Sequence, residues 1–191
     1  LRQLLPVMIG WMGMGADPDQ GLLSFRRLSD AIGTSHWFMG MLRDSRLVAK
    51  RLSYICSGSR WTSDRLSETP QAVSWLDDDA DLQIRPREVL AGEVASLLLR
   101  RLLGLRSENY EQVATEAIST LLAIRSREQL RSAMADTLDG VDPLRGAAAL
   151  SQVTEVVLDG AIRVAHAVAI AQTQGPQALE KGVDETGHLL A

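Results

Sequence analysis

The stretch SENYEQVATEAISTLLAIRSREQLRSAMADTLDG, residues 107–140, decides the fold class. Its apolar side chains recur at spacings of three and four residues, which is the pattern of one face of an α-helix. These side chains are Tyr110, Val113, Ala117, Ile118, Leu121, Leu122, Leu130, Met134 and Leu138. Glycine is common just beyond a helix end, so Gly140 predicts that the helix stops at about Asp139. A helix of that length extends about 45 Å at ~1.5 Å per residue, which is too long for one small globule to bury.

Two further long helices are predicted beside this one. The first covers residues 87–103 and ends at Gly104, and the second covers residues 143–174 and is closed by Gly175 and Pro176. The loops between the three helices are short, and short loops make consecutive helices neighbours that run in opposite directions. The second half of the chain is therefore predicted to be an antiparallel bundle.

The first part of the chain predicts shorter helices. Asp17 can cap a helix that has Pro18 at its first position, and a later helix restarts after Ser45 and ends at Ser57 and Gly58. Three apolar stripes at helical spacing are expected to face a core. They are Leu22, Phe25, Leu28 and Ile32; Trp37, Phe38, Met41 and Leu42; and Leu47, Val48, Leu52 and Ile55.

The acidic run DDDAD, residues 77–81, is the clearest change in composition, and Pro86 follows it. Clustered carboxylates can bind a divalent cation, but we interpret this run as a solvated acidic linker. We place a domain boundary here. The predicted fold is all-α, with a short-helix subdomain over residues 1–81 and a long-helix antiparallel bundle over residues 82–191.

Composition limits the classes of function. Apolar residues make up 46% of the 191 residues, which is enough for a core, and the single cysteine cannot form an internal disulfide. Residues 1–70 hold nine Lys and Arg against six Asp and Glu, and residues 71–191 hold eleven against eighteen. Neither part has the basic balance of a nucleic-acid binder, so no nucleic-acid partner is expected. No membrane segment or signal peptide is expected either, and a cytoplasmic location is the default.

Candidate catalytic and metal-binding residues are few. His36, His166 and His188 are too far apart in the sequence for a metal signature, and Cys56 has no second thiol. No catalytic, cofactor-binding or metal-binding residue is predicted in this chain.

The polar segment RSREQLR, residues 125–131, interrupts the apolar stripe of the central long helix. One interpretation is a solvated face or a slight kink. The other is a contact surface for another domain or an acidic partner, formed by Arg125, Arg127 and Arg131. Arg127 and Arg131 lie one helical turn apart, so they could act together.

Three extended segments resemble the helical part of the glutamine synthetase adenylyltransferases, bifunctional enzymes that attach AMP to glutamine synthetase and remove it. The first is LLPVMIGWMGMGADPDQGLLSFRRLSD, followed by SHWFMGMLRDS; the second is AKRLSYICSGSRWTSDRLSETPQAVSWL; the third is RSREQLRSAMADTLDGVDPLRGAAALSQVTEVVLDGAIRVA. The resemblance rests on extended pattern and order, because none of these segments is a short catalytic signature.

The resemblance implies a piece of a longer protein, and the start at Leu1 and the ending HLLA fit that expectation. In the family, a Gly-Met-Gly turn followed by a Ser-x-Asp-x-Asp set holds magnesium and ATP, and this sequence lacks that pattern. The resemblance therefore implies an inactive helical linker between two nucleotidyltransferase domains, in a parent enzyme that uses magnesium and ATP. It also implies glutamine synthetase and the PII signalling protein as partners of the parent.

An alternative function belongs to a different class. A free-standing helical module for ligand binding or dimerisation, such as the effector domain of a transcription regulator, would have an apolar cavity between its long helices.

Overall fold

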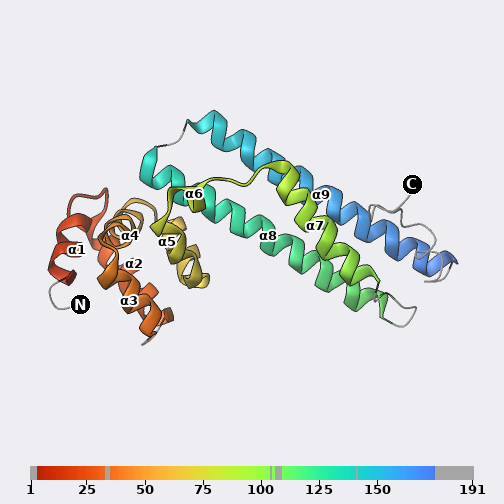
Figure 1. The fold of residues 1–191 in the computed structure, drawn as a ribbon, viewed down its shortest axis with the longest axis horizontal. Helices are drawn as coiled ribbons and strands as arrows, with labels where there is room; N and C mark the ends of the chain where they lie inside the picture. Colours follow the sequence, from red (N-terminus) through yellow and green to blue (C-terminus); the bar gives the residue numbers. More distant parts are fainter. Residues whose placement is uncertain (1–3, 33–34, 104, 106–108, 141, 175–191) are drawn as a thin grey trace. The chain divides into compact units, whose positions relative to one another are not determined.

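The computed structural model describes residues 4–32, 35–103, 105, 109–140 and 142–174. These residues form helices joined by short connections, and there is no strand among them, so the all-α prediction is confirmed (Figure 1). The chain divides into two compact units. Unit 1 consists of Leu1–Ile84 and Leu130–Gly146, and unit 2 consists of Arg85–Gln129 and Ala147–Ala191.

Unit 1 holds the short helices of the chain. They are α1 (Leu4–Met12), α2 (Pro18–Ile32), α3 (His36–Asp44), α4 (Arg46–Gly58), α5 (Arg60–Glu68), the 3-10 helix η1 (Pro70–Asp77) and α6 (Asp79–Leu82). The predicted cap of α2 is present, because the Asp17 carboxylate accepts a hydrogen bond of 3.0 Å from the backbone N–H of Gln20. Ser45 caps α4 by accepting a bond of 3.3 Å from the backbone N–H of Val48. Local capping chemistry thus sets where these two helices begin.

The helix α4 is the centre of unit 1 and packs against α1, α2, α3, α5 and η1. Its inward side chains are fully or almost fully buried, and they are Val48, Ala49, Leu52, Ser53, Ile55, Cys56 and Ser57. Ser45, the N-cap residue of α4, also donates a hydrogen bond of 2.8 Å from its hydroxyl to the Asp77 carboxylate. Burial of this apolar face supplies the main favourable term in folding unit 1.

Three apolar residues predicted to face the core of unit 1 are instead exposed. The exposed fractions are 42% for Leu22, 43% for Trp37 and 45% for Leu47. Successive helical residues point about 100° apart, so the next residues, Phe38 and Val48, take the inward direction. On α2 the inward positions belong to the small residues Gly21 and Ser24 together with Leu28. Gly21 is required there, because a Cβ on it would lie 2.9 Å from the Cβ of Ser57 on α4.

The Cys56 thiol is expected to be unreactive in the folded protein. Burial raises the pKa of this thiol to about 12, and the nearby Ser63 hydroxyl lowers it only in part. A thiol whose pKa is raised on folding contributes stability below its unfolded pKa, near 9.0, and that contribution is lost as the pH rises toward 12. At pH 8, labelling with a thiol reagent should be at least about 100-fold slower in the native chain than in urea. Equal rates in the two conditions would contradict the burial of Cys56.

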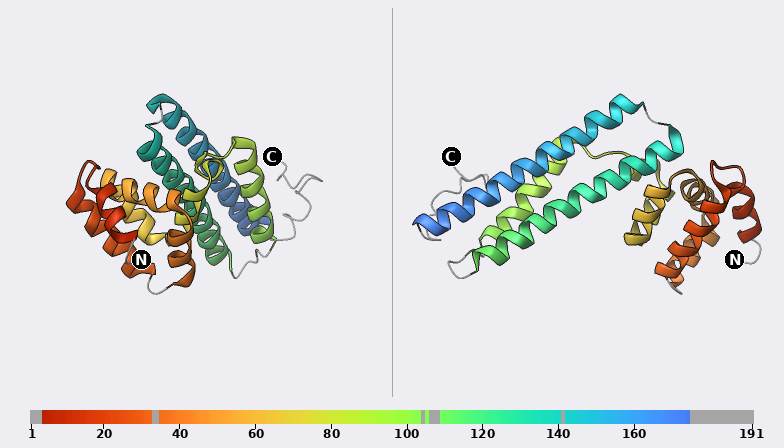
Figure 2. Two further views of the ribbon diagram at one scale, coloured as in Figure 1. Left: turned by 60° about the vertical axis from the view of Figure 1, so that its left-hand side comes forward. Right: turned by 180° about the vertical axis from the view of Figure 1, so that it is seen from behind.

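Unit 2 is built from three long helices. They are α7 (Arg87–Leu102), the part of α8 (Tyr110–Asp139) up to Gln129, and the part of α9 (Pro143–Gln174) from Ala147 onward. Within this unit, α8 runs opposite to both α7 and α9, and Figure 2 shows α8 and α9 side by side from behind. The antiparallel arrangement is therefore confirmed for these helices. The predicted helix ends at Gly104 and Gly175, and the predicted start at Ser107, lie outside the described residues.

The core of unit 2 is lined by one stripe from each helix. The buried residues are Leu90, Val94 and Leu98 of α7; Ala117, Leu121 and Ile124 of α8; and Val153, Val156, Val157, Val164, Ala167 and Ala171 of α9, together with Leu105. Leu122, predicted to belong to the buried stripe, is 50% exposed. It is adjacent to Leu121, which takes the inward direction, as in the pairs of unit 1.

Gly160 allows the three helices of unit 2 to approach closely. A Cβ on it would lie 2.9 Å from Leu121 Cδ2 of α8 and 3.0 Å from Val94 Cγ1 of α7. We expect Gly160→Val to lower the free energy of unfolding by about 1–3 kcal/mol through overpacking, as measured by urea unfolding followed by circular dichroism.

Gly92→Val is the matched control, because a Cβ on this exposed glycine of α7 would meet nothing within 4 Å. Both substitutions exchange the same residue types inside a helix, so the difference between them isolates packing. Similar stabilities of the two variants would contradict the close approach at Gly160.

The compact units group the chain differently from the predicted division at residues 81 and 82. The first passage between units follows Ile84, close to the acidic run, but Leu130–Gly146 also belongs to unit 1. The last turns of α8 do so because Leu130 and Met134 join the same buried cluster as α4. The division into domains 1–81 and 82–191 stays a prediction.

No described helix is both long and apolar enough to span a membrane.

Candidate functional site

The three arginines singled out in the sequence lie on α8 in different environments. Arg125 is exposed and Arg127 is partly buried. Arg131 is only 8% exposed. Arg125 and Arg127 belong to unit 2, and Arg131 belongs to unit 1.

Arg127 is held by two carboxylates of unit 2. Its Nη1 and Nη2 donate to the two oxygens of Glu93 on α7 at 3.1 and 2.9 Å, which is the paired geometry of a bidentate guanidinium–carboxylate bond. Its Nε donates to Glu128 Oε1 at 3.0 Å. Arg127 thus ties α7 to α8.

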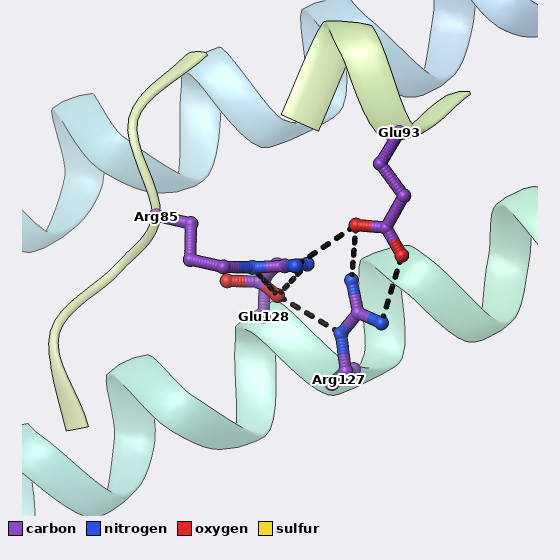
Figure 3. A network of polar contacts seen from close by, with 4 residues as sticks. All are labelled: Arg85, Glu93, Arg127 and Glu128. Atoms are coloured by element: carbon purple, nitrogen blue, oxygen red, sulfur yellow. Dashed lines mark hydrogen bonds and ion pairs between the residues drawn. The ribbon is translucent and has the colours of Figure 1, made fainter. Parts of the chain in front are cut away.

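Arg85 completes the network from the segment that precedes α7 (Figure 3). Its Nε and Nη2 donate to Glu128 Oε1 at 3.0 and 2.6 Å, and its Nη1 lies 2.9 Å from Glu93 Oε2. Figure 3 shows the two guanidinium groups converging on the same pair of carboxylates. Each carboxylate is therefore shared by two arginines.

Burial decides how strongly these ion pairs matter. The Glu128 side chain is 0% exposed, and those of Arg85, Glu93 and Arg127 are 28–30% exposed. A buried carboxylate is tolerated only when it is paired and hydrogen-bonded, because removing its charge from water costs several kcal/mol. The two cations and two anions balance one another. Such an arrangement fixes the geometry of helices, and it does not resemble a nucleophile poised beside a base.

Arg131 stacks on an aromatic ring inside unit 1. Its guanidinium carbon lies 4.3 Å from the ring centroid of Trp75 in η1. This cation–π contact is stronger than an exposed one because Arg131 is largely removed from water. Arg127 and Arg131 are thus both engaged inside the described chain, while Arg125 faces solvent. Whether these arginines contact another domain stays a prediction.

Sequence reasoning missed Arg85, Glu93, Glu128 and Trp75. One signal was available for Glu128, which follows Leu121 and Ile124 at spacings of seven and four, on the inward face of α8. A glutamate at an inward position requires a cationic partner, but the sequence does not say that Arg85 would supply it.

The acidic run at residues 77–81 is predicted to be a solvated linker, and its five residues are indeed exposed. It is not an irregular linker, because Asp77 ends η1 and Asp79–Leu82 form α6. The Asp77 carboxylate accepts the hydrogen bond from the Ser45 hydroxyl, and Asp79 forms an ion pair with Arg51 of α4. Asp78 caps α6, because its carboxylate accepts a hydrogen bond of 2.9 Å from the backbone N–H of Ala80. The bonds of Asp77 and Asp79 join η1 and α6 to α4 and its N-cap, whereas the bond of Asp78 caps α6 itself.

The described residues contain no group of three or more His, Cys, Asp or Glu side chains placed to hold a metal ion. His36 and His166 are exposed, and His188 lies outside the described residues.

Comparison with known proteins identifies the family. Residues 49–187 match the sequence profile of the family described as glutamate-ammonia ligase adenylyltransferase. The chain belongs to this family. A bifunctional glutamine synthetase adenylyltransferase/adenylyl-removing enzyme of Leifsonia xyli is 44% identical over 168 residues, which cover 86% of this chain and 16% of that relative. The enzyme of the same description from Streptomyces coelicolor is 35% identical over 85% of this chain and 17% of its own length.

The matched part is a small share of these family members. The chain spans about a sixth of the length of the curated relatives it matches. No solved structure matches the chain. The family is thus shown by sequence over most of the chain, and the polar network at Arg85 and Arg127 falls inside the matched residues.

Proposed function

We propose that this chain is a non-catalytic helical region of a bifunctional enzyme that adenylylates glutamine synthetase from ATP and removes the adenylyl group. The observation that carries the proposal is the 44% identity over 86% of the chain to a relative with that description. The long helices of unit 2 and their paired charges suit a scaffold, because their polar groups are used in holding helices together. Magnesium and ATP belong to the proposed parent activity, and we assign no residue of this chain to them.

The proposed task is to space two nucleotidyltransferase domains and to relay signals between them. The signals we propose are glutamine and the PII signalling protein, in the control of nitrogen assimilation. A relay requires an element with two alternative packings that each active site favours differently. The charge network around Glu128 is a candidate, since ion pairs can exchange partners in a way that apolar contacts cannot.

Two measurements test the absence of catalysis in this chain. A protein that carries this chain within the full length of its relatives should transfer AMP from ATP to glutamine synthetase, whereas the 191-residue chain should not. Calorimetric titration of the chain with ATP and Mg²⁺ should give no binding heat. Clear saturable binding would contradict the proposal and would place a nucleotide site on this chain.

A second candidate function is supported by one feature of unit 2. An open apolar groove of about 350 Å³ lies between α8 and α9, and its lining includes Ala114, Ile118, Val164 and Val168. A free-standing ligand-binding module would use such a groove. The family assignment favours the scaffold, and binding of small apolar ligands with micromolar affinity would favour the module instead.

A further inference from the structure

Unit 1 is assembled from two stretches that are distant in sequence. Leu130 and Met134 of α8 are 2% and 0% exposed, and they pack in one buried cluster with residues of Leu1–Ile84. Everything between these stretches, Arg85–Gln129, belongs to unit 2. The segment Arg85–Gln129 is therefore an insertion between the two stretches of unit 1, whereas the rest of unit 2, Ala147–Ala191, follows them. The core of unit 1 forms only when the two ends of this insertion are brought together.

Closing an insertion costs chain entropy, and the cost depends on its effective length. For a flexible loop, the closure term grows with the logarithm of the number of residues. A folded insertion whose ends are already held together removes most of this term, since only a few residues then remain to be closed. Any bond between the two ends of Arg85–Gln129 should thus favour the core of unit 1.

The polar network contains such a bond. Arg85 is the first residue of the insertion, and Glu128 is the last but one. The Arg85 guanidinium donates to Glu128 Oε1 at 3.0 and 2.6 Å, and the Glu128 side chain is 0% exposed (Figure 3). A charge-assisted bond to a buried carboxylate is among the stronger polar interactions in a protein. Other pairs of unit 2, such as Arg101 with Glu116, lie in the middle of the insertion and do not join its ends.

We propose that the Arg85–Glu128 pair is a clasp that closes the insertion Arg85–Gln129 and thereby stabilises the core of unit 1. Neither residue belongs to unit 1, so the clasp acts on that core through the two chain ends that it brings together. If a flexible insertion of this length is replaced by one whose ends are held together, the equilibrium constant for bringing the two stretches of unit 1 together rises by up to about 100-fold, because the closure entropy depends on the logarithm of loop length. Packing of α7 on α8 also restrains the two ends of the insertion. Opening the clasp alone should therefore lower the folding equilibrium constant of unit 1 by less than this maximum, about tenfold or more. This proposal goes beyond the function proposed above and does not depend on it.

The tryptophans allow unit 1 to be observed by itself. The chain has four, Trp11, Trp37, Trp61 and Trp75, and all of them lie in Leu1–Ile84. Tryptophan fluorescence during urea unfolding therefore reports on unit 1. In the 191-residue chain, Arg85→Gln should reduce the folding equilibrium constant measured by fluorescence at least about tenfold, although the substituted residue lies in unit 2.

Two control variants separate a clasp from a general loss of stability in unit 2. Glu93→Gln weakens the bonds of Glu93 to Arg127 and Arg85 but leaves the Arg85–Glu128 bonds in place. Arg101→Gln removes the pair in the middle of the insertion. Arg101→Gln should shift the fluorescence transition much less than Arg85→Gln, and Glu93→Gln should fall between them, because Glu93 and Arg127 also lie near the two ends of the insertion. Equal shifts for the three variants, or an unchanged transition for Arg85→Gln, would overturn the proposal.

Hydrogen exchange gives a second reading if Arg85→Gln unfolds too readily for a titration. Under native conditions, amide protection in residues 131–138 of α8 should fall more than protection in residues 156–171 of α9, because only the former belong to unit 1. A uniform fall across both segments would overturn the clasp, since it would show one general destabilisation.

Discussion

Replacing Glu128 with alanine is expected to lower the free energy of unfolding by about 3–5 kcal/mol. The side chain is 0% exposed, and its Oε1 accepts bonds from both Arg85 and Arg127. Removing it leaves two guanidinium groups, each about 30% exposed, that share the single carboxylate of Glu93, together with a cavity where a fully buried side chain was. Urea unfolding followed by circular dichroism at 222 nm measures the loss. Glu128→Gln should fall between the wild type and Glu128→Ala, because it keeps an acceptor but loses the charge.

Glu116→Ala is the matched control for this prediction. Glu116 also lies on α8 and pairs with an arginine, Arg101, but its side chain is 45% exposed. Exposed pairs contribute about 0–1 kcal/mol, because water screens the charges and the side chains lose entropy on pairing. If the two alanine variants lost equal stability, burial of the network could not be the cause.

The second large effect is expected at Phe38 of α3. This side chain is 0% exposed in the core of unit 1, so Phe38→Ala should cost about 3–5 kcal/mol through lost burial and the cavity that remains. The neighbouring Trp37 is 43% exposed and meets the Phe38 ring edge-on at 5.9 Å. Trp37→Ala should therefore cost only about 0.5–1.5 kcal/mol.

This comparison is decisive for the orientation of α3, because the two aromatic residues are adjacent in sequence. Circular dichroism is the appropriate probe, since Trp37→Ala itself changes the fluorescence. A larger loss for Trp37→Ala than for Phe38→Ala would show that the helix turns its other side to the core.

The helical class and the starts of several helices could be predicted from the sequence because they depend on local chemistry. Asp17 and Ser45 cap helices through bonds to backbone groups only three residues away. Apolar spacing of three and four residues is likewise a local property. The orientation of Trp37 and Leu47 could not be predicted in this way, because a stripe that includes adjacent apolar residues does not determine which of them points inward.

The composition of the units and of the polar site depends on distant contacts. The Arg85–Glu128 bond joins residues 43 positions apart, and the Arg127–Glu93 bond joins residues 34 apart. Neither separation leaves a periodic signal in the sequence. The same is true of the packing of Leu130 and Met134 with α4, which places the end of α8 in unit 1. The sequence could identify RSREQLR as unusual, but only the structure shows that Arg127 and Arg131 are engaged internally.

Arg127 and Arg131 contact other residues of this chain, Glu93 and Trp75 among them, so substitutions at these positions affect the fold as well as any relay. Alanine substitutions at these positions are expected to destabilise the scaffold, whereas Arg125 is exposed and can be replaced without loss of a described contact. Arg125→Ala therefore tests a contact surface, and Arg127→Ala tests the network. Arg101→Ala, which removes an exposed pair of unit 2, controls for a general change of charge.

The most direct test of the scaffold and relay is made in an enzyme that carries this chain within the full length of its relatives. The adenylylation rate and the removal rate on glutamine synthetase are measured with and without glutamine for Arg125→Ala, Arg127→Ala and Arg101→Ala. We predict that Arg127→Ala changes the ratio of the two rates, or its response to glutamine, while Arg101→Ala does not. Unchanged rates and an unchanged glutamine response in folded Arg125→Ala and Arg127→Ala enzymes would contradict a relay through this region.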